Sequence, residues 1–327
     1  MIISTTILFG LFSTWVRVSH AQLSGLFNVT TFPNEQKDNV TKWLAEARAT
    51  AGVDLYPYFA HRCILAQVYP ELSSGLATPG LVTPREVFDR LYFIGQSFVS
   101  AWAYDTGEGL IVFDSLDNAG EAENILIPNL EALGFAGTDI KHLVITHEHF
   151  DHYGGARWLQ DNFHPATYAS AAAWESLAGV QNGPLKDKTV AEGDELTVGN
   201  VTFKFYETPG HTPGTISAVF SVYDNGVEHK AGFFGGVGFP SAAAAKTQQI
   251  ASLNRFADLG LEAGVDTVIA NHQSMDRSLY HFDLLEHRPS GAENPFVIGA
   301  DAAARYFRFN GHCTRVQAAR DGQYLQV

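Results

Sequence analysis

Hydrophobic and polar positions follow two different patterns along the chain, and the change falls near residue 90. Between residues 22 and 84 the sequence is irregular and interrupted by prolines, so we expect an N-terminal extension that wraps the main domain. This extension contains one predicted helix, at residues 35–51. From Leu91 onward, short apolar runs alternate with glycine-containing turns, which is typical of strands. The pattern therefore predicts a main domain at residues 91–327.

The main domain mixes predicted strands and helices. Apolar or alternating runs predict strands at residues 91–94, 99–104, 110–114, 140–146, 201–206, 215–223, 229–234 and 265–270. Apolar residues at helical spacing predict helices at 126–133, which Pro128 starts or kinks, around 250–257, which Gly260 ends, and at 301–319. Because strands cluster in each half and helices follow them, we expect an α/β fold with two sheets packed face to face and helices outside.

The first residues resemble a targeting segment. Residues 2–16 are mostly apolar and lead to Ser19-His20-Ala21, a small-x-small cleavage pattern. We interpret residues 1–21 as a signal peptide, which leaves the extension at 22–90, and expect a secreted protein that is not held at a membrane after cleavage. A buried N-terminal helix or an uncleaved anchor is the alternative, because no basic residue precedes the apolar run.

Two further features agree with export. Asn-Val-Thr sequences, the acceptor pattern for N-glycosylation, occur at Asn28, Asn39 and Asn200. The chain has two cysteines, Cys63 and Cys313. In an oxidising compartment they would form a disulfide that ties the extension to the last helix; two buried thiols are the alternative.

Composition and charge exclude several classes of function. The chain is 46% hydrophobic and 17% charged, as expected of a folded globular protein. It has 21 Lys and Arg against 35 Asp and Glu, a formal net charge of -14. Nucleic acids and anionic membranes bind mainly through Lys and Arg, so neither is an expected partner. We expect a small-molecule substrate, and the sequence does not specify an oligomeric state.

The segment Thr-His-Glu-His-Phe-Asp-His at 146–152 carries four candidate metal ligands. It supplies His147, His149, Asp151 and His152, directly after a predicted strand. A loop leaving the carboxyl end of a strand can aim several side chains at one point above the sheet. Neutral imidazole and carboxylate are natural ligands of Zn²⁺. A surface cluster in a polar loop is the alternative, and further ligand candidates elsewhere in the chain count against it.

Two more histidines follow predicted strand ends. His211 lies between two Pro-Gly pairs at 209–214, and His272 follows the strand at 265–270. Six candidates exceed the four ligands of one zinc ion and suit two Zn²⁺ ions that share a bridging water. The other histidines lack such settings and are expected to be surface or paired core residues: His61, His142, His164, His229, His281, His287 and His312.

Four sequence features together resemble those of the metallo-β-lactamase superfamily. They are the H-x-H-x-D-H segment, Gly154-Gly155, the Gly-His-Thr-Pro-Gly segment at 210–214 and the late histidine His272. The resemblance covers about residues 91–320 and is closest to the lactamase subclass without a cysteine ligand. It implies a four-layer αββα sandwich after the N-terminal extension. One metal would then be held by His147, His149 and His211, and the other by Asp151, His152 and His272.

Asp114 closes the predicted strand at 110–114, which resembles the first motif of that superfamily. The resemblance implies that Asp114 orients a ligand histidine from behind; a strand-end cap is the alternative.

Two differences between this chain and members of the superfamily bear on the expected substrate. Thioesterases of the glyoxalase II type carry a bridging Asp after the strand that follows Gly-His-Thr-Pro-Gly, and residues 232–240 contain no acid. The lactamase subclass often has Asp-Ser where this chain has Gly235-Gly236. That serine helps to hold the substrate carboxylate, so we expect β-lactam cleavage to be weak and uncharged substrates to be preferred.

The resemblance implies a secreted di-zinc hydrolase. A metal-bound hydroxide would attack the carbonyl of a lactam, lactone, ester or amide, while Asp151 orients the hydroxide and moves its proton. The alternatives are a thioesterase of the glyoxalase II type, an iron-dependent redox enzyme on the same fold, and a non-hydrolytic or biosynthetic metalloprotein.

Overall fold

The computed structural model describes residues 29–70 and 80–326. The predicted signal peptide at 1–21 and the acceptor Asn28 lie outside these residues. Within the described part of the chain, no helix has both the length and the apolar composition that a membrane span requires.

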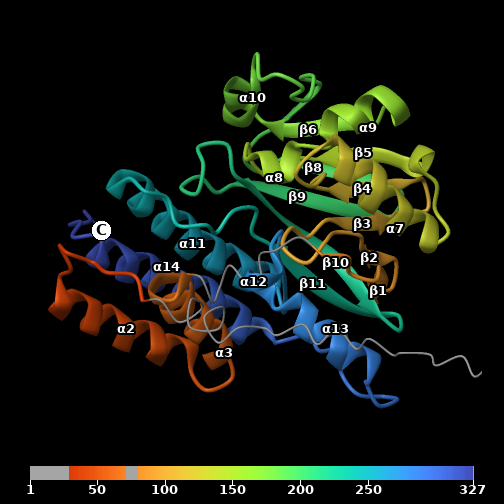
Figure 1. The fold of residues 1–327 in the computed structure, drawn as a ribbon. Coiled ribbons are helices and arrows are strands. Elements are labelled where there is room, and N and C mark those ends of the chain that lie inside the picture. The colour runs from red at the N-terminus through yellow and green to blue at the C-terminus, as the bar shows by residue number, and fades with distance from the viewer. Residues whose placement is uncertain (1–28, 71–79, 327) are drawn as a thin grey trace, which may run out of the picture.

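Two sheets lie face to face (Figure 1). The first has the strand order β1-β2-β3-β4-β5-β6-β7 and the second the order β12-β11-β10-β9-β8. Strands β4 to β7 run parallel, as do β11 and β12, and the other neighbours are antiparallel. The first sheet consists of β1 (Arg85–Phe88), β2 (Leu91–Phe93), β3 (Trp102–Asp105), β4 (Leu110–Phe113), β5 (Ile140–Val144), β6 (Ala166–Ser170) and β7 (Lys188–Val190). The second consists of β8 (Glu195–Val198), β9 (Val201–Glu207), β10 (Ile216–Asp224), β11 (Val227–Phe233) and β12 (Thr267–Ile269).

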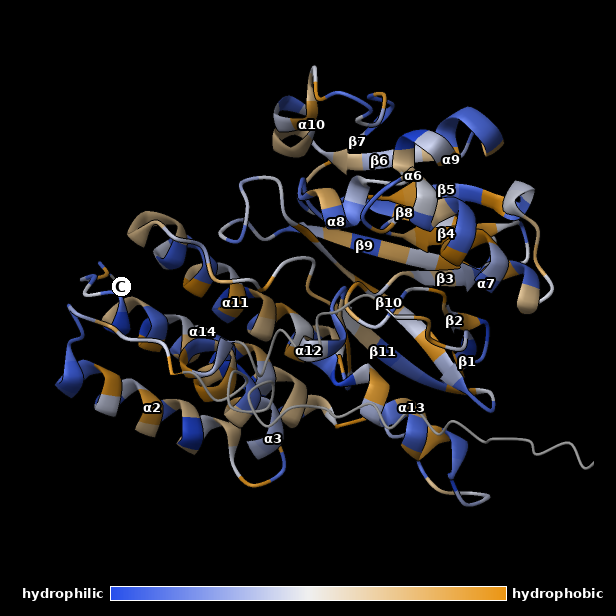
Figure 2. Cartoon of the chain, viewed as in Figure 1, coloured by the Kyte–Doolittle hydropathy of each residue, from blue (hydrophilic) through white to orange (hydrophobic). Residues whose placement is uncertain are grey.

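Aromatic side chains fill the space between the sheets. The ring of Phe220 on β10 lies 5.7 Å from that of Phe113 on β4 and 4.9 Å from that of Phe203 on β9, and all three are almost completely buried. Burying a phenylalanine side chain stabilises a fold by about 1.5–3 kcal/mol. Strand β11 carries hydrophilic residues at 228–230, in its more exposed half, and is buried where it ends in this core (Figure 2). The core thus clamps the two sheets together.

Helices cover the outer face of each sheet. On the first sheet, Leu126, Leu130 and Leu159 pack with Val112 and Leu143. These leucines come from η2 (Ala122–Leu126), α7 (Ile127–Ala132) and α9 (Ala156–Phe163). On the second sheet lie α11 (Ala243–Ala263) and α14 (Ala300–Arg320). The expected four-layer αββα sandwich is therefore confirmed.

Shorter helices connect these layers. They are α6 (Ala119–Glu121), η3 (Gly137–Asp139), α8 (Phe150–Tyr153), α10 (Ala171–Leu177), α12 (Gln273–Asp276) and α13 (Ser278–Glu286).

Several element boundaries differ from those predicted. Gly260 does not end α11; the helix continues to Ala263, because Gly264 is the residue that adopts the left-handed conformation of a helix end, with φ 76°. Pro128 is an early residue of α7, and the helical segment changes from a π turn to an α-helix just before it. The strand predicted at 140–146 ends at Val144, because Thr146 bonds to a side chain rather than continuing the ladder. The elements that the sequence pattern did not predict include strands β1, β6, β7 and β8 and helices α9, α10, α12 and α13.

The N-terminal extension packs against the last helix of the main domain. Its helix α2 (Lys37–Ala51) lies beside α14 (Figure 1), and the predicted helix at 35–51 matches it closely. It continues through α3 (Tyr56–Phe59), the π-helical η1 (Ala60–Leu65) and α4 (Ala66–Val68). Cys63 on η1 and Cys313 on α14 form a disulfide across a sequence separation of 250 residues. The extension is thus covalently joined to the outer helix layer.

Candidate metal centre

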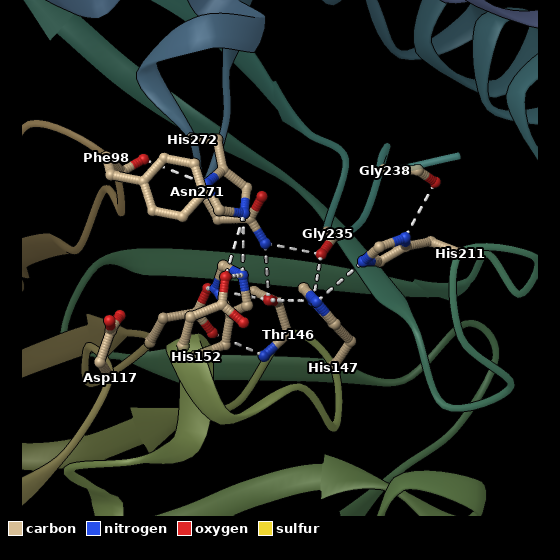
Figure 3. A network of polar contacts seen from close by, with 12 residues as sticks. Phe98, Asp117, Thr146, His147, His152, His211, Gly235, Gly238, Asn271 and His272 are labelled. Atoms are coloured by element: carbon tan, nitrogen blue, oxygen red, sulfur yellow. Dashed lines mark hydrogen bonds and ion pairs between the residues drawn. The ribbon is translucent and has the colours of Figure 1, made fainter. Parts of the chain in front are cut away.

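The six candidate ligands meet at one edge of the sandwich in two adjacent groups. One group contains His147, His149 and His211, and the other contains Asp151, His152 and His272. Within each group the donor atoms lie within 4.8 Å of one another. The ring centroids of His147 and His152 are 4.1 Å apart, so the two groups are neighbours (Figure 3). The structure therefore brings together every metal-ligand candidate that the sequence proposed.

Asp114, directly after β4, bonds through its side chain to the loop at 146–152, which carries four of the ligand candidates. Its side chain is fully buried and its φ is 63°, an uncommon conformation for a residue other than glycine. Its carboxylate accepts hydrogen bonds from the backbone N–H of Thr146 at 2.8 Å, the Thr146 hydroxyl at 2.9 Å and Nδ1 of His152 at 2.7 Å. The same carboxylate thus closes the strand end and orients a histidine, so the two interpretations of Asp114 are compatible.

In the three-histidine group, backbone carbonyls fix two of the rings. Nδ1 of His147 donates to the carbonyl of Gly235 at 2.8 Å, and Nδ1 of His211 donates to the carbonyl of Gly238 at 2.9 Å. Both Nε2 atoms then point inward and lie 3.2 Å apart. His149 completes the group from the exposed side of the loop.

The second group is arranged in the same way. His272 donates through Nδ1 to the carbonyl of Phe98 at 3.0 Å, and its Nε2 lies 3.1 Å from that of His152. An oxygen of Asp151 lies 3.2 Å from Nε2 of His152 and 3.5 Å from Nε2 of His272. One carboxylate and two imidazoles therefore converge on one point.

The chemistry of this donor set fits a divalent cation. An imidazole whose Nδ1 donates a hydrogen bond carries its lone pair on Nε2. At 3.1–3.2 Å, each pair of Nε2 atoms is close enough to bind one cation, since a Zn–N bond is about 2.0–2.1 Å long. The acceptors on Nδ1 are the kind of outer contact that holds metal-binding histidines in place.

The pKa values of the ligand candidates follow from their surroundings. Burial lowers the pKa of His211 to about 3 and that of His272 to about 4, and it lowers the pKa of His147 well below its usual range. These three rings are therefore neutral at pH 7. Burial also opposes charge on His152, but the Asp114 and Asp151 carboxylates outweigh it and raise its pKa to about 9. Burial raises the pKa of Asp151, but the neighbouring His152 and His272 outweigh this and hold it below its usual range.

Two residues that the sequence analysis did not single out connect the loops of the site. Glu148 accepts hydrogen bonds from the Thr212 hydroxyl at 2.7 Å and from the N–H of Gly214 at 3.0 Å. Asn271 donates to the Thr146 hydroxyl and to the carbonyl of Gly235. Their positions inside the histidine motif and next to His272 are the only sequence signals that pointed to them.

Glycines 235, 236 and 238 are required by close packing against the site. A Cβ at Gly236 would lie 2.8 Å from Cδ2 of His211, and a Cβ at Gly238 would lie even closer to the same ring. A Cβ at Gly235 would collide with the carbonyl of Ile216. A serine at 236 would therefore displace His211, so the missing carboxylate anchor cannot be restored there.

A pocket of about 460 Å³ opens next to the three-histidine group. Its described lining consists of His149, His211, Phe239, Pro240, Ser241, Ala242 and Ala245. These residues include no Lys or Arg, so the pocket offers apolar surface beside the histidines and no permanent positive charge.

The remaining predicted sites lie elsewhere. His229 pairs with Asp266 at 2.7 Å, and His281 bonds to the Tyr58 hydroxyl at 3.2 Å, as expected of paired histidines. Asn39 is half-buried in α2 and bonds to Gln36. Asn200 lies exposed in the turn between β8 and β9.

Residues 94–223 match the family model described as the metallo-beta-lactamase superfamily. The hydroxyacylglutathione hydrolase of Idiomarina loihiensis is 34% identical over 121 residues, which cover 36% of this chain and 40% of that protein. The hydroxyacylglutathione hydrolase of Rhodospirillum rubrum is 34% identical over 94 residues, which cover 29% of this chain and 34% of that protein. The chain spans only about a third to a half of the length of the curated relatives it matches.

Solved structures share the fold. The native FEZ-1 metallo-beta-lactamase from Legionella gormanii has a TM-score of 0.60 at 20% identity, covering 70% of this chain and 93% of that one. BJP-1, a subclass B3 metallo-beta-lactamase of Bradyrhizobium japonicum, has a TM-score of 0.59 at 22% identity, covering 71% of this chain and 92% of that one. At these identities the likeness establishes the fold.

If the Asp151, His152 and His272 group holds a divalent metal such as Zn²⁺, Asp114→Asn is expected to weaken its binding about 10- to 100-fold, because an amide does not hold His152 as the carboxylate does. Competition titration against a chromophoric chelator measures this. The matched control is Asp105→Asn, which removes a carboxylate at the last residue of another strand, β3, where it accepts a hydrogen bond from the N–H of Gly107. Equal zinc affinities in the two variants would contradict the role of Asp114.

Proposed function

From the premise that this chain carries a metallo-beta-lactamase domain, we propose that it is a di-zinc hydrolase of uncharged acyl compounds, namely lactones, esters or amides. The observation that supports this most strongly is the pair of three-ligand groups with inward-facing Nε2 atoms. The hydrolase relatives support the reaction class. The proposal places one Zn²⁺ at His147, His149 and His211 and the other at Asp151, His152 and His272.

When bound, zinc polarises a carbonyl oxygen and lowers the pKa of a coordinated water towards 7. The residues of the chain supply orientation and proton transfer. Asp151 is half-buried beside His152 and His272, and in this proposal its carboxylate aligns the attacking water and moves its proton. The Asp114 carboxylate keeps His152 in its tautomer throughout the reaction, and the carbonyls of Gly235 and Gly238 do the same for His147 and His211.

The pocket beside His149 and His211 supports an uncharged substrate. Phe239, Pro240 and Ala242 provide apolar surface for an acyl chain. A substrate carboxylate would find no Lys or Arg among the described lining residues and would face a chain with a net charge of -14. A missing hydrogen bond to a charged group costs about 1.5–3 kcal/mol, which is roughly ten- to a hundredfold in transition-state binding.

A thioester is the second candidate substrate, because the curated relatives are named hydroxyacylglutathione hydrolase. The loop after β11 argues against it. At Gly235 a backbone carbonyl bonded to His147 and Asn271 faces the site, and no acid occurs in residues 232–240.

Purified protein is expected to contain close to two Zn²⁺ per chain, and chelation is expected to abolish hydrolysis of a panel of neutral lactones, esters and glutathione thioesters. His149→Ala should lower kcat/KM by about a hundredfold or more, because it removes a zinc ligand. His164→Ala is the control, since His164 bonds to the Gln160 carbonyl at the end of α9 and should change kcat/KM less than about twofold. Elemental analysis without bound transition metal, together with chelator-resistant activity, would refute the proposal.

A positive charge introduced at the pocket should change substrate preference. Ala242→Arg places a guanidinium on the exposed rim and is expected to raise kcat/KM for a carboxylate-bearing lactam about tenfold relative to a neutral lactone. Ala242→Gln adds a long side chain without charge and should leave this ratio unchanged. Efficient cleavage of penicillins by the unmodified protein would show that another residue holds the carboxylate.

We also propose that the chain is exported. The Cys63–Cys313 disulfide supports this, because cytosolic proteins keep their thiols reduced. Mass spectrometry of protein from its native host, without reductant, should find an N-terminus at or near Gln22, an intact disulfide and hexose mass at the exposed Asn200. An intact Met1 on cytosolic protein would contradict export.

A further inference from the structure

Arg62 in the N-terminal extension is a buried cation without a carboxylate partner among the described residues. The residue is only 6% exposed. Its guanidinium donates to the carbonyl of Val237 and lies 3.4 Å from the ring centroid of Phe239, while its Nε has no partner in the described part of the chain. Burial lowers the pKa of Arg62 to about 9, so it stays charged at pH 7. A buried charge without a carboxylate partner is costly for the fold.

The segment that carries Arg62 is held firmly on the main domain. The adjacent Cys63 is bonded to Cys313 on α14. Gln67 donates to the carbonyls of Arg62 and Cys313, and Arg320 donates to the carbonyl of Cys63. Arg62 therefore projects from a fixed support rather than from a free arm.

Arg62 contacts Val237 and Phe239, which lie on either side of a residue whose carbonyl orients a ligand histidine. Between Val237 and Phe239 lies Gly238, whose carbonyl accepts from Nδ1 of His211 at 2.9 Å and from the Gln249 amide at 2.8 Å. Phe239 itself lines the pocket beside His211. The cation thus holds both sides of the residue that orients His211, and it supports one wall of the pocket.

We propose that Arg62 is a positioning residue, through which the N-terminal extension sets both the orientation of His211 and the Phe239 wall of the substrate pocket. This inference rests on the proposed zinc hydrolase function. Removing the guanidinium should free the backbone at 237–239, tilt His211 and widen the pocket. Zinc affinity at the three-histidine group and KM should therefore change, while the other zinc group should not.

The variant Arg62→Met keeps a long apolar side chain and removes the charge. Titration against a chromophoric chelator is expected to show about tenfold weaker zinc binding for one of the two ions only. KM for a neutral lactone should rise by about the same factor, with a smaller change in kcat. Hydrogen exchange of peptides covering 235–240, measured without metal, should be about tenfold faster. Arg62→Lys, which retains charge and a donor, should recover most of these losses.

Arg315→Met is the matched control. Arg315 stacks on Trp43 at 4.6 Å between α14 and α2, so its loss disturbs the same extension without touching residues 235–240. If Arg62→Met and Arg315→Met gave equal zinc affinity, KM and exchange rates, the proposal would be overturned. If Arg62→Met does not fold, Phe239→Leu tests the same contact from the other side and should raise KM and the exchange rate of 235–240. Should the unmodified protein bind no zinc, the proposed function fails, while the exchange data still decide the role of Arg62.

Discussion

The candidate metal centre depends on one constraint, which is that four imidazole rings each have Nδ1 committed to an acceptor. The acceptors are the Asp114 carboxylate and the carbonyls of Phe98, Gly235 and Gly238. Since Nδ1 donates, the Nε2 atom of each ring faces the centre of the site, and pairs of these atoms lie 3.1–3.2 Å apart. The scaffold therefore holds the four rings in the orientation in which they would bind a metal ion.

The same constraint accounts for the glycines after β11. The carbonyls of Gly235 and Gly238 reach the histidines because the backbone passes close to its neighbours: a Cβ at 236 or 238 would collide with the His211 ring, and a Cβ at 235 with the carbonyl of Ile216. A loop specialised in this way has no room for a side chain that binds substrate at position 236. The apolar pocket formed by Phe239 and Pro240 lies just beyond it. Under the proposed function, this short segment both orients the histidines and lines the substrate pocket.

The N-terminal extension contacts the loop beside the candidate metal centre as well as the outer helices of the fold. It packs along α14, is bonded to it through Cys63, and sends Arg62 to the loop at 237–239. The family model begins only at residue 94, so these contacts come from a part of the chain outside the matched domain.

The sequence by itself determined the strand and helix periodicity, the two-sheet architecture and the six candidate ligands. His147, His149, Asp151 and His152 lie in one short segment, and His211 and His272 each follow a strand end, so residue type and local pattern were sufficient. Only the tertiary structure determined which groups support these ligands through hydrogen bonds. Phe98 is 174 residues from His272, and Arg62 is 175 residues from Val237. Three of the four Nδ1 acceptors are backbone carbonyls, which every residue type carries, so only the path of the folded chain determines which of them face a histidine.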